Sequence, residues 1–278
     1  MNNIAFLLTC HNRRDKTIAC LHSLFDIVQD ADVYLVDDGS TDGTSKCVAE
    51  YYPQIHIIHG DGNLFWSRGM YVAWKEAIKS KYKFYIWLND DIELYPFFLD
   101  ELMLCYKHLS RPCVISGIIE DKMTHKTIYG GSDSNGKLLH TNGKIQEIVH
   151  MNGNVVLVPQ TVVEKIGIID PKLHHDLGDV DYGLMVQEAG MKVFITRKPI
   201  AAGYINNYCR VRRWSTSLFK RFKYLYSPLG GNVLVNFYFR RKHFGILNAT
   251  LYFIYLHCLN ILPDNLVEYL FGNTYKDN

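Results

Sequence analysis

Short apolar runs alternate with longer amphipathic segments over roughly the first 117 residues of the chain. The runs have the length of buried strands, and the segments between them have the length of helices. This alternation is typical of βαβ units, in which helices connect parallel strands. It predicts an α/β fold with a mostly parallel sheet flanked by helices. The predicted strands lie at 4–9, 33–36, 55–58, 84–88 and 114–116, and the predicted helices at 16–28, 44–51, 67–80 and 96–108.

The pattern changes after residue 117. Residues 118–150 are polar and rich in glycine, with Gly130-Gly131 and Asn142-Gly143 as turn signals, which predicts irregular strands or a hairpin excursion. A regular pattern then returns. It predicts a strand at 155–158, a helix at 161–166, a loop at 170–178 and a helix at 180–189.

Aromatic and basic residues dominate beyond Trp214. The apolar run 244–262 is nearly long enough to span a membrane, but polar residues such as Asn248 and His257 interrupt it, so an interfacial helix fits better. Either a membrane surface or a second subunit would cover such a segment, and the oligomeric state stays open. We expect two domains, a main one at 1–215 and a helical extension at 216–278.

Composition narrows the class of protein. The 278 residues are 48% hydrophobic and 21% charged, which is ordinary for a globular protein with a large core. A formal charge of +2 argues against a nucleic-acid partner, although basic residues crowd between Arg197 and Lys242. Seven cysteines without a CxxC pair, and an N-terminus without a basic region, argue against a disulfide framework, a zinc site and a secretory signal. A reducing, cytoplasmic location is expected.

An apolar strand, 84–88, runs directly into Asn89-Asp90-Asp91. Carboxylates at the carboxyl edge of a parallel sheet would repel a bound diphosphate unless a divalent cation lay between them. If the strand geometry persists, Asn89 and Asp91 share one side, so Asp91 is the preferred metal ligand, with Asn89 near the ribose or a metal-bound water. From these three residues alone, an Asx turn that caps the next helix is an equal alternative.

A second acidic turn follows the predicted strand at 33–36, in the segment VDDGSTD. A carboxylate such as Asp38 can accept the N–H of a pyrimidine, and Gly39 allows a sharp turn beside a flat ring. Ser40 or Asp42 can also cap the following helix, and the two roles are compatible.

These segments together resemble the family 2 glycosyltransferases of GT-A fold over about residues 4–215. Thr9-Cys10-His11-Asn12-Arg13 is similar to the first-strand motif of the family, VDDGSTDGT to its nucleotide motif, and Leu88-Asn89-Asp90-Asp91 to its DXD motif. Asn63-Leu64-Phe65-Trp66-Ser67-Arg68-Gly69 is similar to a further segment that touches the nucleotide. The resemblance implies Asp91 as ligand of Mn2+ or Mg2+. It implies nucleotide contacts for Thr9, His11, Arg13, Asp38, Gly39, Asn63, Arg68, Asn89 and Asp90.

The resemblance continues on the acceptor side, at Gly153-Asn154-Val155 and at Gly178-Asp179-Val180-Asp181, which aligns with the family's EDVD segment. In that segment the aspartate after the glutamate is the usual candidate base, which implies Asp179. Inverting transfer needs one carboxylate that takes a proton from the acceptor hydroxyl. A helix that begins near Val180 puts Asp179 and Asp181 on different faces, so Asp181 is the alternative base. Gly178 replaces the glutamate of the family segment. Another residue, for example His175 or Asp176, must then orient the base or tune its pKa.

Arg210-Val211-Arg212-Arg213-Trp214 resembles the QxxRW motif of processive family members, with Arg210 in place of glutamine. The resemblance implies that Arg213 binds diphosphate and that Trp214 stacks on a sugar. A membrane-facing surface is the alternative. No histidine stands after Lys198 as a further metal ligand; Asn206 and Asn207 are found there. The remaining acceptor-side candidates are Trp66, Asn154 and His175.

The sequence thus predicts an inverting glycosyltransferase. It would move a sugar from a UDP- or dTDP-sugar to a saccharide or lipid-linked saccharide in surface polysaccharide synthesis, in the cytoplasm or on the inner face of the plasma membrane. A noncatalytic nucleotide- or carbohydrate-binding module is the alternative, for which Gly178 gives some support. A nucleotidyltransferase is less favoured, because TCHNRRDKT lacks the glycine-rich phosphate loop.

Overall fold

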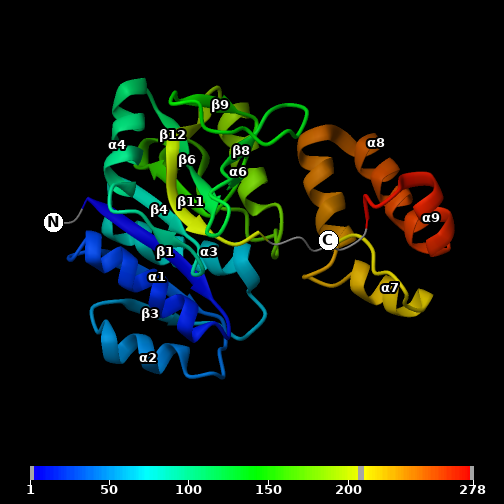
Figure 1. The fold of residues 1–278 in the computed structure, drawn as a ribbon, viewed down its shortest axis with the longest axis horizontal. Coiled ribbons are helices and arrows are strands. Elements are labelled where there is room, and N and C mark those ends of the chain that lie inside the picture. The colour runs from blue at the N-terminus through cyan, green and yellow to red at the C-terminus, as the bar shows by residue number, and fades with distance from the viewer. Residues whose placement is uncertain (1–2, 206–209, 276–278) are drawn as a thin grey trace. The chain divides into compact units, whose positions relative to one another are not determined.

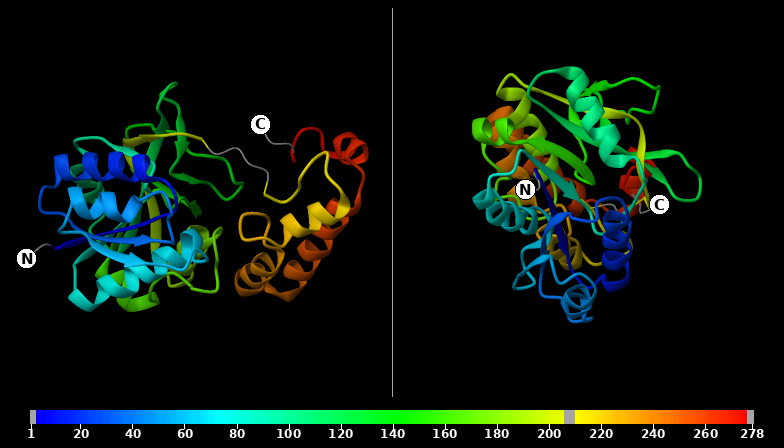
Figure 2. Two further views of the ribbon diagram at one scale, coloured as in Figure 1. Left: turned by 90° about the horizontal axis from the view of Figure 1, so that it is seen from below. Right: turned by 90° about the vertical axis from the view of Figure 1, so that its left-hand side faces the viewer.

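The computed structural model describes residues 3–205 and 210–275. Contacts divide the chain into two compact units, which Figures 1 and 2 draw as ribbons. The first comprises Met1–Pro171 and Gly178–Ile205, and the second Lys172–Leu177 and Asn206–Asn278. The division falls at residue 205 rather than at the expected 215, because segment 210–215 packs within the second unit. Asn260 Nδ2, for example, donates to the carbonyl oxygen of Val211 at 2.9 Å.

The first unit is built on one mixed sheet in which the strand order is β3-β2-β1-β4-β11-β6-β12-β5. Strands β3, β2, β1 and β4 are parallel, and β11 runs antiparallel to both of its neighbours. A separate antiparallel pair is formed by β8 and β10. The strands of the unit are β1 Ile4–Cys10, β2 Asp32–Asp37, β3 His56–His59, β4 Phe84–Leu88, β5 Glu93–Leu94, β6 Cys113–Asp121, β7 Thr127–Tyr129, β8 Gly131–Ser132, β9 Gln146–Ile148, β10 His150–Met151, β11 Val155–Pro159 and β12 Lys192–Gly203.

Helices cover both faces of this sheet (Figures 1 and 2). Side chains of β1 alternate between two cores: Phe6 and Leu8 pack with residues of α1 and α4, while Ala5 and Leu7 pack with residues of α3 and α6. The arrangement confirms the predicted α/β class. The helices of this unit are α1 Arg14–Ile27, α2 Thr44–Tyr51, α3 Phe65–Ala77, α4 Phe98–Leu109, α5 Gln160–Ile166 and α6 Gly178–Glu188.

The strand order reverses direction between β1 and β4. From β1 the chain proceeds to β2 and β3 on one side, and then crosses through α3 to β4 on the other side. Ligands of open α/β sheets bind at the carboxyl ends of the strands where such a reversal occurs. The turns after β1, β2 and β4, which carry the acidic motifs, therefore meet at one place.

The second unit is helical, with α7 Leu218–Leu225, α8 Val233–Ile261 and α9 Asp264–Phe271. It has a small core of its own around Leu225, Val233 and Leu256. Among the described residues, α8 is the one helix long and apolar enough to cross a membrane by length and composition. Gly245 interrupts it, however, with φ 84° and ψ 168°, so α8 consists of two shorter helices.

Candidate functional site

The turn after β4 presents two carboxylates in different surroundings. Asp90 is buried, and its oxygens accept hydrogen bonds from Arg13 Nη1 at 2.8 Å and from the Thr17 hydroxyl at 3.2 Å. Burial raises the pKa of Asp90 to about 6, although the Arg13 guanidinium opposes this shift. Asp90 therefore ties the turn to the start of α1.

Asp91 is the more accessible of the two, with 21% of its side chain exposed against 5% for Asp90. Its Oδ2 lies 3.0 Å from Arg13 Nη2, so one guanidinium bridges both carboxylates. Arg13, predicted to contact the nucleotide, is thus engaged with the acids themselves.

The donor set at this turn can be compared with the needs of a divalent cation. Within residues 3–205 and 210–275, no three or more His, Cys, Asp and Glu side chains gather closely enough to hold a metal ion. A hard cation keeps several waters and accepts phosphate oxygens, so a single protein carboxylate is an acceptable contribution. Asp91 is the carboxylate of this turn that could fill that role, if a diphosphate and water supplied the remaining ligands.

The Asp38 carboxylate organises the loop before α3. Its Oδ1 accepts the N–H of Gly62 at 2.8 Å, and its Oδ2 accepts those of Leu64 at 3.0 Å and Phe65 at 2.9 Å. Asp38 is buried, and these backbone groups occupy both of its oxygens. Asp38 thus shapes the loop that leads to Trp66, and the prediction that it binds a pyrimidine stays a prediction.

Gly39 allows the loops after β2 and β3 to pack backbone against backbone. Its φ is +70°, and a Cβ at this position would lie 2.9 Å from the Gly62 nitrogen. The turn after β1 joins the same cluster, because His11 Nδ1 lies 2.6 Å from the carbonyl oxygen of Asp38. The three loops form one hydrogen-bonded wall beside the acids.

Trp66 connects this wall to the turn after β4. Its Nε1 donates to Asn89 Oδ1 at 2.8 Å, and the Asn89 backbone N–H donates to the carbonyl oxygen of Asn154 at 2.9 Å. The side chain of Asn89 also donates to that of Asn154, which in turn donates to Asn152. Residues from three separate segments of the sequence are thereby held in register.

Asp179 lies at the start of α6, where its carboxylate is held by two backbone N–H groups. Oδ2 accepts from Gly153 at 2.9 Å and Oδ1 from Val180 at 2.8 Å. Burial raises the pKa of Asp179, and these two hydrogen bonds oppose the shift. Asp181 is fully buried, which withdraws the alternative base from any acceptor.

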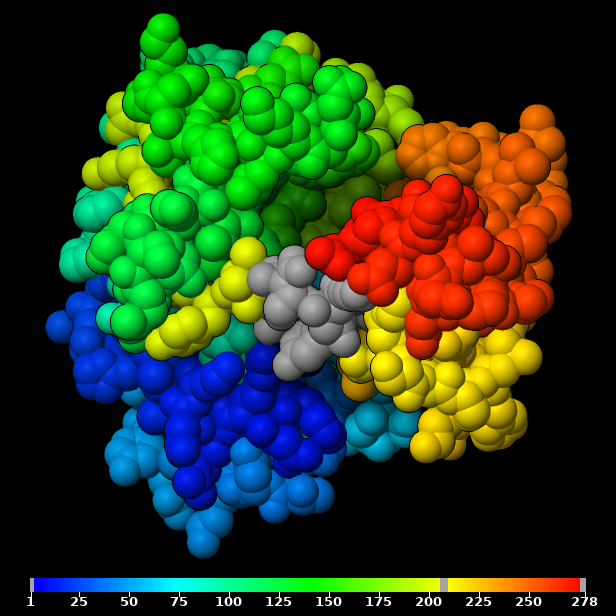
Figure 3. Space-filling model, turned by 45° about the vertical axis from the view of Figure 1, so that its right-hand side comes forward, coloured from blue at the N-terminus to red at the C-terminus, as the bar shows by residue number. Residues whose placement is uncertain are grey.

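A cavity of about 310 Å³ opens at Asp179. Most of its lining comes from the segment that contains β7, β8 and β10, the Gly-rich excursion of the sequence, which appears in green in Figure 3. Besides Asp179, its lining includes hydroxyl, imidazole and amide side chains that could bind sugar hydroxyls. These polar lining residues are Tyr129, Ser132, His150 and Asn152.

A continuous path of contacts joins the nucleotide side of this edge to the cavity. It begins at a carboxylate on the loop after β2, passes through an indole and two amides, and ends at a carboxylate on α6. Each step of the path is either a hydrogen bond or a peptide bond between sequence neighbours. Its residues, in order, are Asp38, Phe65, Trp66, Asn89, Asn154, Gly153 and Asp179.

Gly178, which departs from the family pattern, has no room for a side chain. A Cβ there would lie 2.4 Å from Ser67 Oγ and 3.4 Å from Trp66 Cζ3. The start of α3 thus fills the space that a glutamate would need. Of the proposed substitutes for that glutamate, His175 and Asp176 both belong to the second unit, where Asp176 lies 3.4 Å from Arg210 Nε.

Three other predicted nucleotide contacts lie at or near the same edge. Thr9 packs against α3, where a Cβ on Gly69 would lie 2.3 Å from Thr9 Oγ1. Arg68 Nε donates to the carbonyl oxygen of Pro171 at 3.1 Å, and Asn63 is exposed in the loop that Asp38 shapes.

The segment Arg210–Trp214 belongs to the second unit. Arg212 is fully buried and donates to Asp264 Oδ1 at 2.6 Å, so it ties the start of α9 to this segment. The Arg213 guanidinium lies 4.2 Å from the centre of the Tyr224 ring, and Trp214 Nε1 donates to the carbonyl oxygen of Tyr275 at 2.5 Å. Asn206 and Asn207 lie outside the described residues.

Besides Tyr129, Ser132 and His150, which line the cavity, sequence reasoning missed three residues that shape the site. Thr17 holds Asp90, Ser67 excludes a side chain at position 178, and Asn152 continues the amide chain and lines the cavity. The pattern Asn152-Gly153-Asn154 before a strand was a usable signal for the last of these. Thr17 and Ser67 carry no such signal, because their roles depend on segments distant in the sequence.

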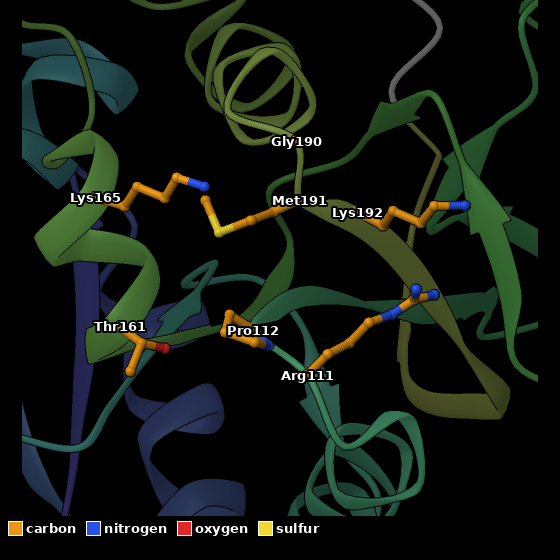
Figure 4. A pocket seen from close by; sticks show the side chains of 7 residues that line it. All are labelled: Arg111, Pro112, Thr161, Lys165, Gly190, Met191 and Lys192. Carbon is orange, nitrogen blue, oxygen red and sulfur yellow. The ribbon is translucent and has the colours of Figure 1, made fainter.

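A second cavity, of about 290 Å³, lies at the amino ends of β6 and β12 (Figure 4). Two of the lysine side chains that line it already have partners. Lys165 Nζ donates to the carbonyl oxygen of Ala189 at 2.6 Å, and Lys192 pairs with Glu147 at 2.5 Å. The acidic turns of the candidate site follow the carboxyl ends of β2 and β4, so this cavity is separate from that site.

Comparison with known proteins identifies the fold and the family. The family described as Glycosyl transferase family 2 matches residues 6–154, which is more than half of the chain. The chain belongs to glycosyltransferase family 2. No curated protein matched its sequence significantly. The GT-A fold predicted from the motifs is thus confirmed, and the chain is a glycosyltransferase by family.

Solved glycosyltransferase structures share the fold at low sequence identity. GalNAc-T7 with UDP, GalNAc and Mn2+ is 14% identical with a TM-score of 0.58, over 74% of this chain and 44% of that one. S. aureus TarS 1–349 is 12% identical with a TM-score of 0.56, over 99% and 73%. The same fragment in complex with UDP is 15% identical with a TM-score of 0.52, over 74% and 61%. The chain therefore spans less than half of the GalNAc-T7 chain.

Proposed function

We propose that this glycosyltransferase moves a sugar, with inversion, from a UDP- or dTDP-sugar to a saccharide or lipid-linked saccharide acceptor. The observation that carries the proposal is the path from the Asp38 loop through Asn89 to Asp179. It sets a nucleotide-side loop, an acidic turn and a half-buried carboxylate beside one cavity. Donor, acidic turn and acceptor would then share a single edge of the sheet.

Asp179 is the proposed base. It would accept the proton of an acceptor hydroxyl in the cavity while that oxygen attacks the anomeric carbon. The hydrogen bonds from Gly153 and Val180 fix the orientation of the carboxylate, and its raised pKa makes it a stronger base than an exposed aspartate. The burial of Asp181 supports this choice between the two.

Asp91 is the proposed protein ligand of a divalent cation, Mn2+ or Mg2+. When bound, such a cation would neutralise charge on the departing diphosphate. Arg13 holds Asp90 and Asp91 together and adds a fixed positive charge to the same turn. UDP in the TarS and GalNAc-T7 structures, and Mn2+ in the latter, support this assignment for the donor side.

We further propose that the product belongs to a surface polysaccharide and that the enzyme works in the cytoplasm or on the inner face of the plasma membrane. The six cysteines in the described residues are free thiols, as expected in a reducing compartment. A lipid-linked acceptor would place the reaction at a membrane surface.

A transfer assay with a panel of UDP- and dTDP-sugars and Mn2+ tests the function. We expect Asp179→Asn to bind donor nucleotide normally but to lose transfer by a factor of about 100 or more. Asp91→Ala should instead lose the Mn2+-dependent part of nucleotide binding. Metal-dependent nucleotide binding by the wild-type protein, without transfer or hydrolysis of any donor, would favour a noncatalytic module.

A further inference from the structure

Exposed apolar side chains are concentrated in the second unit. In the described residues, 15 of the 21 large apolar side chains that are exposed lie between Leu218 and Phe271. Large exposed apolar surfaces of soluble proteins commonly mark sites where a partner or a membrane binds. Figure 3 shows the surface of α8 and α9 in orange to red.

The second half of α8 carries the most regular part of this surface. Leu247, Leu251, Ile254 and Ile261 are 70%, 59%, 52% and 59% exposed, and Cys258 between them is exposed as well. Their spacing of four and three residues places them on one face of the helix. The opposite face is apolar too, because Ala249, Leu256 and Leu259 are buried in the unit. A regular apolar face that is this exposed indicates a site where a partner or a membrane binds.

The net charge of the second unit indicates what kind of partner would bind this face. Residues 210–275 contain nine Arg and Lys but only two Asp and Glu, whereas the whole chain has 30 and 28. One of the two acids, Asp264, is engaged with Arg212 and Arg221. The unit therefore carries a strong positive charge on a chain that is otherwise slightly acidic.

Exposed cations lie next to exposed apolar residues along the chain. On α7, Lys220 and Lys223 follow Leu218 and Phe219, of which Phe219 is 78% exposed. Before the break in α8, Arg241 and Lys242 are exposed and precede Phe244, Ile246 and Leu247. This combination suits a surface that has both acyl chains and anionic headgroups.

We propose that the exposed face of the second half of α8, formed by Leu247, Leu251, Ile254 and Ile261, docks the enzyme on an anionic lipid surface, which the positive charge of the second unit attracts. A second copy of the chain is disfavoured as the cover, because it would bring a second set of like charges to the interface. The proposal goes beyond glycosyl transfer, because docking requires neither donor nor acceptor.

The same face would lie in the interface and not cross the bilayer. The break at Gly245 leaves segment 246–261 as the longest uninterrupted helix of α8. At 1.5 Å per residue this segment is about 24 Å long, shorter than the roughly 30 Å hydrocarbon core of a bilayer.

Cosedimentation of the full chain with lipid vesicles tests the proposal. The vesicles are phosphatidylcholine alone, or phosphatidylcholine mixed with phosphatidylglycerol. We expect binding to the mixed vesicles, with at least about tenfold weaker partitioning of Leu251→Asn/Ile254→Asn, since each buried apolar side chain contributes strongly. Lys220→Glu/Lys223→Glu should also weaken binding to the mixed vesicles.

Leu104→Asn/Met123→Asn, which changes two exposed apolar residues of the first unit, is the matched control and should bind like the wild type. Circular dichroism and size-exclusion chromatography establish that each variant is folded. Failure of the wild type to bind mixed vesicles would overturn the proposal, as would equal losses in the control. A wild-type dimer that Leu251→Asn/Ile254→Asn converts to a monomer, with no change in vesicle binding, would assign the face to a second copy.

Discussion

Burial raises the pKa of both Asp90 and Asp179. Their partners nevertheless differ. Asp90 faces a guanidinium and a hydroxyl inside the protein, whereas Asp179 is held by two backbone N–H groups at the edge of a cavity. The first arrangement stabilises a turn, and the second leaves a carboxylate oriented toward a substrate-sized space.

The raised pKa of Asp179 predicts the pH dependence of transfer. A base must be deprotonated, so the rate should fall as the pH drops through the pKa of Asp179. That fall should occur at a higher pH than the value of about 4 expected for an exposed aspartate. The measurement is kcat against pH with saturating donor. A rate that stays constant down to pH 4 would exclude Asp179 as the base.

The contact between Gly178 and Ser67 predicts a compensating pair of substitutions. Gly178→Ala should lower kcat and destabilise the fold by about 1–3 kcal/mol, because the new Cβ overlaps Ser67 Oγ beside Asp179. Adding Ser67→Gly to this variant should restore much of the kcat and much of the stability. Gly203→Ala is the control, since its Cβ would make ordinary contacts at 3.5 Å. Unchanged activity and thermal stability in Gly178→Ala would contradict this account.

At the scale of elements, an ion pair between buried Glu101 and partly exposed Arg197 fixes α4 against β12. Glu101 accepts hydrogen bonds from the Arg197 backbone at 3.0 Å, from Nε at 3.0 Å and from Nη2 at 2.6 Å. The pairing of β12 with β6 shifts register between Ile195 and Pro199, where a regular ladder is lost. Glu101 supplies the acceptor that this irregular backbone lacks.

Replacing Glu101 by Gln should lower the free energy of unfolding by about 2 kcal/mol, because hydrogen bonds to a charged group are lost in a buried site. Burial would raise the pKa of Glu101, but the Arg197 contacts outweigh it and lower the pKa. The contribution is therefore present above the unfolded pKa of about 4.3 and is lost as the pH falls further.

Urea denaturation at pH 7 and pH 3 measures both effects. Glu76→Gln, which breaks an exposed pair with Lys79, should change stability by less than about 0.5 kcal/mol. Equal effects of the two substitutions at pH 7 would show that the Glu101 pair has no special role.

At the scale of the whole molecule, ligand binding should couple to global stability. A ligand present at 100 times its Kd stabilises the native state by about 2.7 kcal/mol, which gives a measurable rise in Tm. We expect UDP or dTDP to raise Tm, and Mn2+ to increase that rise. Thermal unfolding of wild type and Asp91→Ala, with each nucleotide and with or without Mn2+, provides the measurement. A Mn2+ increment that persists in Asp91→Ala would place the cation elsewhere.

Much of the first unit was predictable from local pattern. The strand at 84–88 and the helix at 44–51 have the predicted bounds, because apolar runs and helical periodicity are local properties. The short pairings β5, β8 and β10 were not assigned individually, since two-residue strands depend on partners far away in the sequence. Likewise β6 extends well beyond the predicted 114–116, because pairing with β12 and β7 continues through Asp121.

By itself the sequence determined which residue types follow each strand of the α/β fold, and hence that acids gather at one sheet edge. Only the tertiary structure decided what each acid does. Whether a carboxylate binds backbone, as Asp38 does, pairs with arginine, as Asp90 does, or faces a cavity, as Asp179 does, depends on segments up to 77 residues apart. Side-chain environments arise from such distant contacts, whereas the strand positions along the chain and the residue types that follow them are local properties of the sequence.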